Sequence, residues 1–290
     1  MPQFSQIESI SESAANDTLK EIYADIRKTL QVPAVNLVWR HLATIEHALE
    51  WAWAGVKPLY TEGWLNRPAD HLLSIPGLPA VPVLSETELA ALNVNAQQRK
   101  TVVAVLENYE RSNPANLIAL CALKARLRNE PASGSPEPPE HRSRPTLPEL
   151  PPLMSPASFS DSVMADAVEL SEIGTGAKVD EVVAGVPRHL AHWPALMHRM
   201  VTNLRSHEEA ISKASRWVQS QAHRYGATYT ERLPPPGSKS IARLDNALEL
   251  FSSANVIANF IVKVRLLKTM IGEPAPFTTE NHHASKPEAH

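Results

Sequence analysis

Histidines gather in one short stretch of the second half of the chain. His189 and His192 stand three residues apart, with His198 further along. On a helix this spacing puts two imidazoles on one face, where they could act as a general base or bind a metal. A zinc site would need a further carboxylate or histidine at a matching angle, and none is evident. We therefore favour helix-surface histidines without a metal, and keep His192 as a candidate catalytic residue.

The residues around these histidines occur twice. Arg188-His189-Leu190-Ala191 repeats Arg40-His41-Leu42-Ala43 letter for letter. Each arginine could clamp a substrate carboxylate with two parallel hydrogen bonds, or it could form a cap or a salt bridge between repeats. We favour the structural alternative and retain both arginines as candidate substrate-binding residues. Since His41 duplicates His189, this histidine position serves the architecture of a repeat.

A second, independent match supports a duplication. Asn116-Leu117-Ile118-Ala119, followed by Lys124-Ala125-Arg126-Leu127, corresponds to Asn255-Val256-Ile257-Ala258, followed by Lys263-Val264-Arg265-Leu266. The order and the internal spacing are the same in both halves. We therefore predict one helical unit written twice, a pseudo-dimer within one chain.

Three polar side chains, Asn255, Asn259 and Lys263, interrupt an apolar helical stretch near the C-terminus. Burying them without partners would be costly. We therefore treat them as candidates for lining a pocket. A solvent-facing edge of the helix is the alternative.

Composition bounds the functional class. The 290 residues are 43% apolar, enough for two ordinary domains or one large one. A net charge of −3 with both signs mixed argues against a nucleic-acid partner. The single cysteine, Cys121, excludes a disulfide framework, fits a reducing cytoplasm and is expected to be a packed thiol. We expect no signal peptide and no membrane span, and the absence of GxGxxG and P-loop patterns gives a nucleotide cofactor no support.

Scarce glycine and helical spacing of the apolar residues predict an all-α fold. Asn113 is expected to cap a helix that has Pro114 at its first position, although Asn113 could equally orient a water or a substrate carbonyl. Gly55 is expected to stop an earlier helix. The expected helices cover residues 18–30, 35–54, 64–73, 85–92, 97–109, 113–128, 161–173, 188–205, 207–225 and 241–271.

Proline marks the division of the chain. Eight of the 25 prolines fall within residues 131–152, which we predict to be an extended linker. The predicted organisation is an N-terminal helical repeat over residues 1–130, this linker, a C-terminal repeat over 153–272 and a disordered tail over 273–290.

Several segments together resemble the group I 2-haloacid dehalogenases of the DehI type, which look like two fused AhpD-like repeats. The peroxidase branch of the AhpD-like superfamily uses a Cys-x-x-Cys pair, which a single cysteine excludes. The resemblance implies two AhpD-like helical repeats joined by a proline-rich linker, with a pocket between them lined by residues 32–40 and 180–192. The matching segments are Ile22–Val35, Arg40–Thr44, Ala52-Trp53, Pro76–Pro79, Asn113-Pro114 and Leu190–Pro194.

The resemblance also implies a chemistry, cofactor-free hydrolysis of a short 2-haloacid. In this family an aspartate activates a water that displaces halide from C2. The aspartate position, seven residues before Trp193, holds Val186 here, and the serine before it is Gly185. Because valine cannot accept a proton, we predict that Asp180 or Glu181, just upstream, replaces the base.

Other family positions also differ. Two aromatic lining positions hold Ala34 and Leu37, and the asparagine before the signature tryptophan is His192. Of these positions Asn113 alone is retained. The candidate catalytic residues are Asp180, Glu181, Asn113 and His192, and the candidate substrate-binding residues are Ala34, Leu37, Arg40, Gly185, Val186, Arg188, Asn255 and Asn259.

Two functional hypotheses follow. The first is a hydrolase that dehalogenates a small 2-halo carboxylic acid or catalyses a related reaction. The second is a divergent relative that has lost the base and uses the pocket for cyclisation, isomerisation or binding. A tight polar pocket with a carboxylate favours the first, and a wide aromatic-lined pocket favours the second. A small-molecule substrate is the expected partner, without nucleic acid or membrane, and a homodimer is left open.

Overall fold

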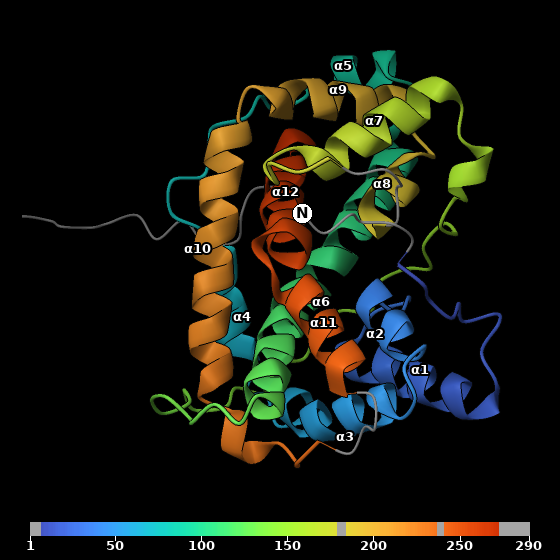
Figure 1. The fold of residues 1–290 in the computed structure, drawn as a ribbon. Coiled ribbons are helices and arrows are strands. Elements are labelled where there is room, and N and C mark those ends of the chain that lie inside the picture. Colours follow the sequence, from blue (N-terminus) through green and yellow to red (C-terminus); the bar gives the residue numbers. More distant parts are fainter. Residues whose placement is uncertain (1–6, 179–183, 237–240, 273–290) are drawn as a thin grey trace, which may run out of the picture.

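The computed structural model describes residues 7–178, 184–236 and 241–272, and within these ranges it contains helices and no β-strand, which confirms the all-α fold (Figure 1). The helices of the first half are α1 (Asp17–Leu30), α2 (Leu37–Leu42), α3 (Ala48–Thr61), α4 (Asn66–Leu73), α5 (Glu86–Ala91) and α6 (Ala96–Leu127). Those of the second half are the short η1 (Pro156–Ser158), α7 (Asp161–Glu172), α8 (Gly185–Leu190), α9 (Pro194–Arg205), α10 (Glu208–Ala227), η2 (Thr230–Arg232), α11 (Ile241–Ser252), η3 (Ala254–Ala258) and α12 (Asn259–Met270).

Helix α6 runs through the centre of the molecule (Figure 1). It is one helix of 32 residues, so the two helices predicted on either side of Asn113 are wrong, and Asn113 is not an N-cap. Pro114 cannot donate the backbone hydrogen bond of an interior helical residue. Packing against α4, α10, α11 and α12 offsets this loss and holds the helix continuous. The helix begins at a capping box formed by Asn95 and Gln98.

The helix predicted over residues 35–54 is divided in the structure. Helix α2 ends at Leu42 and α3 begins at Ala48. Between them His47 has a left-handed φ of 58°, which a right-handed helix cannot continue. Gly55 lies inside α3 and does not stop it, since an ideal Cβ there would lie 3.1 Å from Cδ of Pro234, and the glycine lets that loop approach.

The two Arg-His-Leu-Ala segments have the same local secondary structure. Arg40 is in α2 and Arg188 is in α8, both six-residue helices followed by a short turn and a longer helix. The single helix predicted over residues 188–205 is therefore also divided, into α8 and α9. The duplication and its AhpD-like character stay predictions.

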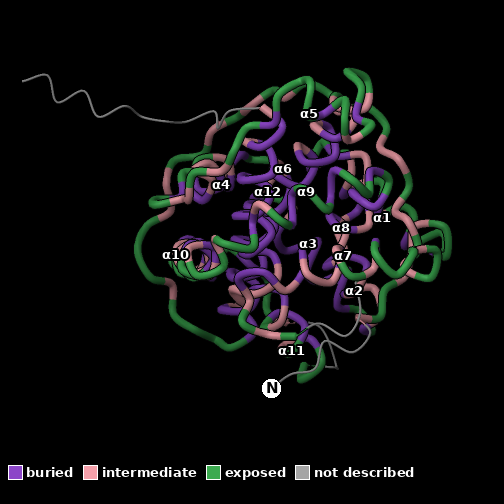
Figure 2. The backbone as a smooth tube through the Cα atoms, turned by 90° about the horizontal axis from the view of Figure 1, so that it is seen from above, coloured by how far each residue is buried: buried purple, intermediate pink, exposed green. Residues whose placement is uncertain are grey.

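The apolar stretch over residues 241–271 is broken by the π-helical turn η3 between α11 and α12. By length and composition Ile241–Met270 could cross a membrane, but 72% of its most apolar window is buried inside the protein, as in a core helix. Figure 2 shows buried backbone gathered around α6 and α12. Cys121 is buried in this core, and burial raises the pKa of its thiol to about 12, as expected for a packed cysteine.

The proline-rich segment contains no helix and is hydrogen-bonded to both halves of the chain, to the second half through Ser133 and Glu137. Asn66 Nδ2 donates to the Glu140 carbonyl oxygen at 2.6 Å, and Arg142 forms an ion pair with Asp70. Arg111 Nη1 donates to the carbonyl oxygen of Pro145 at 2.6 Å. This segment is therefore a fixed part of the surface in the structure, while its boundaries as a linker stay a prediction.

Candidate functional site

A small cavity of about 80 Å³ lies where α2, α6 and α8 meet α11, η3 and α12. It is bordered by residues 34–40 on one side and 184–189 on the other, within the two segments that the sequence predicts to line a pocket. Apolar side chains form most of the wall, and Val256 and Ile257 of the π-helical turn contribute to it. The polar lining residues are Asn36, Arg40, Asn108, Tyr109, Asn113 and His189.

Half of the twelve predicted site residues line this cavity. Arg40 enters from α2 and Asn113 from the middle of α6. Val186 lines it at the start of α8, at the position where the family resemblance places a catalytic aspartate. The six are Ala34, Leu37, Arg40, Asn113, Gly185 and Val186.

Four predicted residues lie outside the cavity. His192 is exposed, with Nε2 2.8 Å from the carbonyl oxygen of Pro152. Arg188 points to the same segment, where its Nε donates to the Met154 carbonyl oxygen at 2.8 Å.

The two predicted asparagines, Asn255 and Asn259, also lie outside the cavity, in different places. Asn259 is fully buried in the second half, where its amide donates to Ser215 Oγ and to the carbonyl oxygen of Ile173. Asn255, in η3, does not border the cavity. Asp180 and Glu181 lie outside the described residues.

Arg40 is a buried cation without a counter-ion. It is 9% exposed, and within the described ranges it forms no ion pair, contrary to the salt bridge favoured from the sequence. Its Nε has no hydrogen-bond partner there, and the same holds for Asn36 Oδ1 and Asn108 Oδ1. Burial lowers the pKa of Arg40. Since an unpaired buried charge is costly, the cavity is suited to an anion that hydrogen-bonds to this guanidinium.

Tyr109 and His189 form a second polar feature of the cavity. The Tyr109 hydroxyl lies 2.8 Å from His189 Nδ1, and both side chains are buried. In the tautomer that carries its proton on Nε2, Nδ1 accepts a hydrogen bond from the Tyr109 hydroxyl. His189 is not the surface histidine favoured from the sequence.

Burial sets the protonation of this pair. It raises the pKa of Tyr109 above its ordinary value, so the phenol stays protonated. It lowers the pKa of His189 to about 4, with smaller contributions from neighbouring positive charges that include Arg40. At neutral pH the imidazole is therefore uncharged and can accept a proton.

The depressed pKa of His189 predicts a pH-dependent stability. Between pH 6.5 and about 4 the unfolded histidine binds a proton that the folded one refuses. The free energy of unfolding should therefore fall on acidification through this window, by on the order of 3 kcal/mol from this residue. Urea unfolding of the wild type and of His189→Gln at pH 4 to 7 measures the difference. Equal pH slopes in the two proteins would show that His189 titrates normally in the fold.

Gly185 has a steric reason to be glycine. A Cβ at this position would overlap the Tyr109 hydroxyl. Gly185→Ala should therefore displace the Tyr109 side chain and lower the free energy of unfolding by about 1–3 kcal/mol. Because Tyr109→Phe removes the clashing oxygen, the double variant should lose less than the sum of the two single variants in thermal or urea unfolding. Additive losses would contradict the contact.

Asn113 belongs to a small amide network at the cavity. Asn36 Nδ2 donates to Ser112 Oγ at 3.0 Å and to Asn113 Oδ1 at 3.2 Å. These bonds join α6 to the start of α2 and fix the Asn113 side chain. Of the two roles left open by the sequence, capping is excluded by its interior position, and orienting a water or a substrate stays a prediction.

Comparisons with known proteins identify the fold. No protein-family model matches the chain. The (R)-2-haloacid dehalogenase of Pseudomonas putida is 27% identical over 106 residues, which is 35% of this chain and 35% of that protein. The chain therefore matches about a third of the length of this curated relative.

Solved structures of D-2-haloacid dehalogenases cover 93% of this chain. A mutant in complex with D-2-CPA aligns over 97% of its length with a TM-score of 0.71 and 17% identity. Another mutant structure gives 0.74 and 17%, and a complex with L-LA gives 0.70 and 18%, each over 98% of its length. These matches confirm the expected resemblance to the 2-haloacid dehalogenases, and the chain has their fold.

Proposed function

We propose that the cavity beside Arg40 binds a small 2-halo carboxylic acid and that the protein hydrolyses it to the 2-hydroxy acid and halide. The observation that carries this proposal is Arg40, a buried guanidinium at an apolar cavity with no counter-ion within the described residues. A carboxylate is the ligand that complements it. A volume of about 80 Å³ restricts the ligand to a few heavy atoms.

The hydrolysis needs an acceptor for the proton of the attacking water. Val186 cannot serve, and the described lining residues include no carboxylate. We propose that Tyr109 and His189 serve together. The water oxygen attacks C2 and the carbon–halogen bond breaks with its electron pair on the halide. The water proton passes to the Tyr109 oxygen while the phenolic proton passes to His189 Nδ1.

Binding of the substrate makes His189 a better base. The positive charge of Arg40 contributes to the low pKa of His189. A carboxylate paired with Arg40 offsets that charge, so the pKa of His189 should rise towards the working pH. Asp180 and Glu181 remain the alternative bases proposed from the sequence.

We also propose a second function, because none of the described residues that line the cavity is a carboxylate that could act as the base. In this alternative the protein has lost hydrolysis and uses the cavity for cyclisation, isomerisation or binding of a small acid. The cavity is tight, as expected for the hydrolase, but Tyr109, Phe251 and Phe260 line it and no described carboxylate does, as expected for the alternative.

Chloride release from each enantiomer of 2-chloropropionate tests the first proposal. Release above the buffer blank supports it, and no release from either enantiomer overturns it. Calorimetric binding of the acid without release would favour the second function. If chloride is released, Tyr109→Phe should slow the reaction strongly. If only Asp180→Asn or Glu181→Gln slows it, one of those carboxylates is the base.

A further inference from the structure

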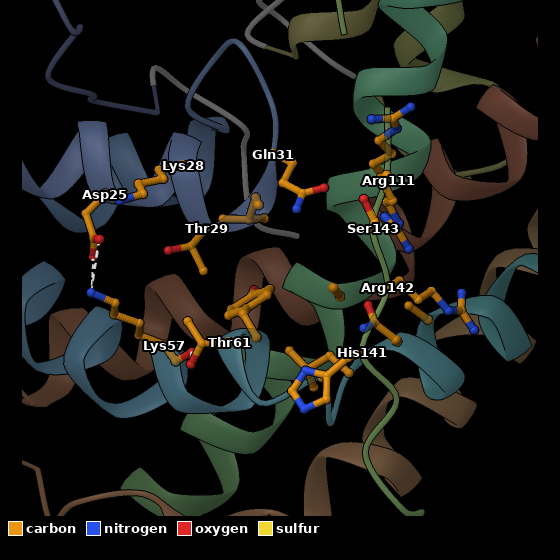
Figure 3. Close-up of a pocket in the computed structure, with 18 residues that line it drawn as sticks. Asp25, Lys28, Thr29, Gln31, Lys57, Thr61, Arg111, His141, Arg142 and Ser143 are labelled. Carbon is orange, nitrogen blue, oxygen red and sulfur yellow. Dashed lines mark hydrogen bonds and ion pairs between the residues drawn. The ribbon is translucent and has the colours of Figure 1, made fainter. Parts of the chain in front are cut away.

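A positively charged cavity lies apart from the Arg40 site. It has a volume of about 560 Å³ and lies between α1, α3, α4, α6 and residues 141–144. Figure 3 shows Lys28 and Lys57 on one side of it and Arg111 and Ser143 on the other. Five cationic side chains line the cavity, against the single carboxylate of Asp25: Lys28, Lys57, Arg111, Arg142 and Arg144.

Three of the five cationic side chains, Lys57, Arg111 and Arg142, form ion pairs. Lys57 pairs with Asp25 at 2.8 Å, and Arg111 pairs with Glu107 at 2.9 Å. Arg142 pairs with both Asp70 and Glu140. Among the described residues Lys28 and Arg144 form no ion pair, although the charges of Asp25 and Asp70 act on them from a greater distance.

Arg144 lies in a partly buried setting beside other arginines, where a bound anion would offset its charge. It is half-buried, and burial lowers its pKa, opposed by the charge of Asp70 and assisted by those of Arg142 and Arg111. The chain on either side is fixed, by Glu140 N donating to the Gly63 carbonyl oxygen at 3.1 Å and by the Arg111 bond to Pro145. A partly desolvated arginine on an anchored backbone, beside other arginines, is a strong anion partner.

From this arrangement we propose that the cavity is a binding site for a small-molecule dianion, a phosphate monoester or a dicarboxylate. Two cations that form no ion pair among the described residues, Lys28 and Arg144, match two negative charges. The volume suits a metabolite-sized ligand, far larger than the Arg40 cavity admits. Thr29, Thr61 and Ser143 at its wall supply neutral hydroxyl groups that can donate to anion oxygens.

Isothermal titration with inorganic phosphate, succinate and propionate tests this site in the full-length protein. At least one dianion should bind more tightly than propionate. Arg144→Met and, separately, the exposed Lys28→Met should each weaken its binding about tenfold or more. Arg40→Met and the remote, exposed Arg216→Met are the controls and should leave dianion binding unchanged.

The pattern across the probes decides the outcome. Binding of phosphate alone or of succinate alone supports the site and identifies its chemistry. Failure of both dianions to bind overturns the proposal, as does equal dianion affinity in wild type, Arg144→Met and Lys28→Met. Loss of dianion binding in Arg40→Met would place the anion in the other cavity and would also overturn it.

Discussion

Replacing Arg40 with methionine should reduce kcat/KM for 2-chloropropionate by about 100-fold or more. The substitution keeps much of the apolar volume and removes the cation proposed to hold the substrate carboxylate. Losing a buried charged hydrogen-bond partner typically costs about 2–5 kcal/mol, and about 1.4 kcal/mol corresponds to a factor of ten. Chloride release over a range of substrate concentrations measures the effect.

Two readouts separate this role from a structural one. Arg188→Met is the matched control, because Arg188 occupies the duplicated position but bonds to Met154 outside the cavity. It should retain most of the activity. Since Arg40 is buried without a counter-ion among the described residues, Arg40→Met should be at least as stable as the wild type to thermal unfolding. An active Arg40→Met protein, or one that is inactive only because it unfolds, would contradict the proposed role.

Glu110→Gln should lower the free energy of unfolding by about 3–5 kcal/mol. Glu110 is buried in α6, pairs with Arg265 at 2.7 Å and also contacts Lys268, both on α12. Removing its charge leaves two buried cations on the central helix pair with only Glu107 beside Lys268. Breaking a buried ion network on one side costs far more than losing a surface pair. Urea unfolding at neutral pH measures the loss.

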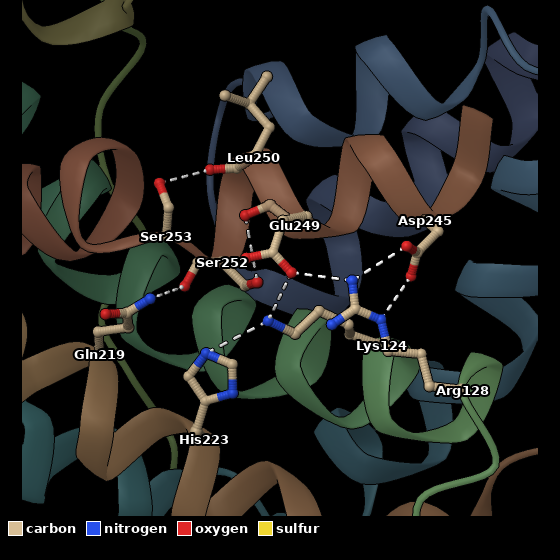
Figure 4. Close-up of polar contacts among 9 residues, drawn as sticks. All are labelled: Lys124, Arg128, Gln219, His223, Asp245, Glu249, Leu250, Ser252 and Ser253. Atoms are coloured by element: carbon tan, nitrogen blue, oxygen red, sulfur yellow. Dashed lines mark hydrogen bonds and ion pairs between the residues drawn. The ribbon is translucent and has the colours of Figure 1, made fainter. Parts of the chain in front are cut away.

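The comparison is an ion-pair cluster whose central carboxylate is about half exposed, although Lys124 within it is buried. Figure 4 shows Glu249 between Lys124 and Arg128, at 3.3 and 2.9 Å. The Glu249 side chain is 52% exposed, so solvent screens these contacts. Glu249→Gln should therefore cost less than Glu110→Gln, because solvent reaches the Glu249 carboxylate and Asp245 still pairs with Arg128. Similar losses for both glutamine variants would show that burial does not govern the strength of the Glu110 network.

Sequence patterns located the cavity because its walls carry the family-like segments. Residues 34–40 and 184–189 lie in two short helices whose Arg-His-Leu-Ala repeats are visible without a structure. Arg40 and Arg188 could not be distinguished, however, since identical local sequences face different surroundings. The long central helix was divided wrongly at Asn113-Pro114 because tertiary packing overrode a strong local signal.

The Tyr109–His189 pair could not be foreseen from the sequence. The two residues are 80 positions apart in the sequence. The spacing of His189 and His192 also does not tell which of the two imidazoles points into the protein core, because helix α8 is only six residues long. One signal was present, the glycine at position 185 where the family resemblance implies serine. The structure explains that departure, because the Tyr109 hydroxyl occupies the space of a side chain there.

A single-turnover reaction with 2-chloropropionate in H₂¹⁸O, with protein in excess, tests the central claim most directly. The described cavity wall has no carboxylate that could form an ester with the substrate, and water is proposed to attack C2 itself. Mass spectrometry of the product should therefore show lactate with one ¹⁸O atom and one equivalent of chloride. Unlabelled lactate would reveal a protein oxygen as the nucleophile, and the absence of lactate would rule out hydrolysis at this cavity.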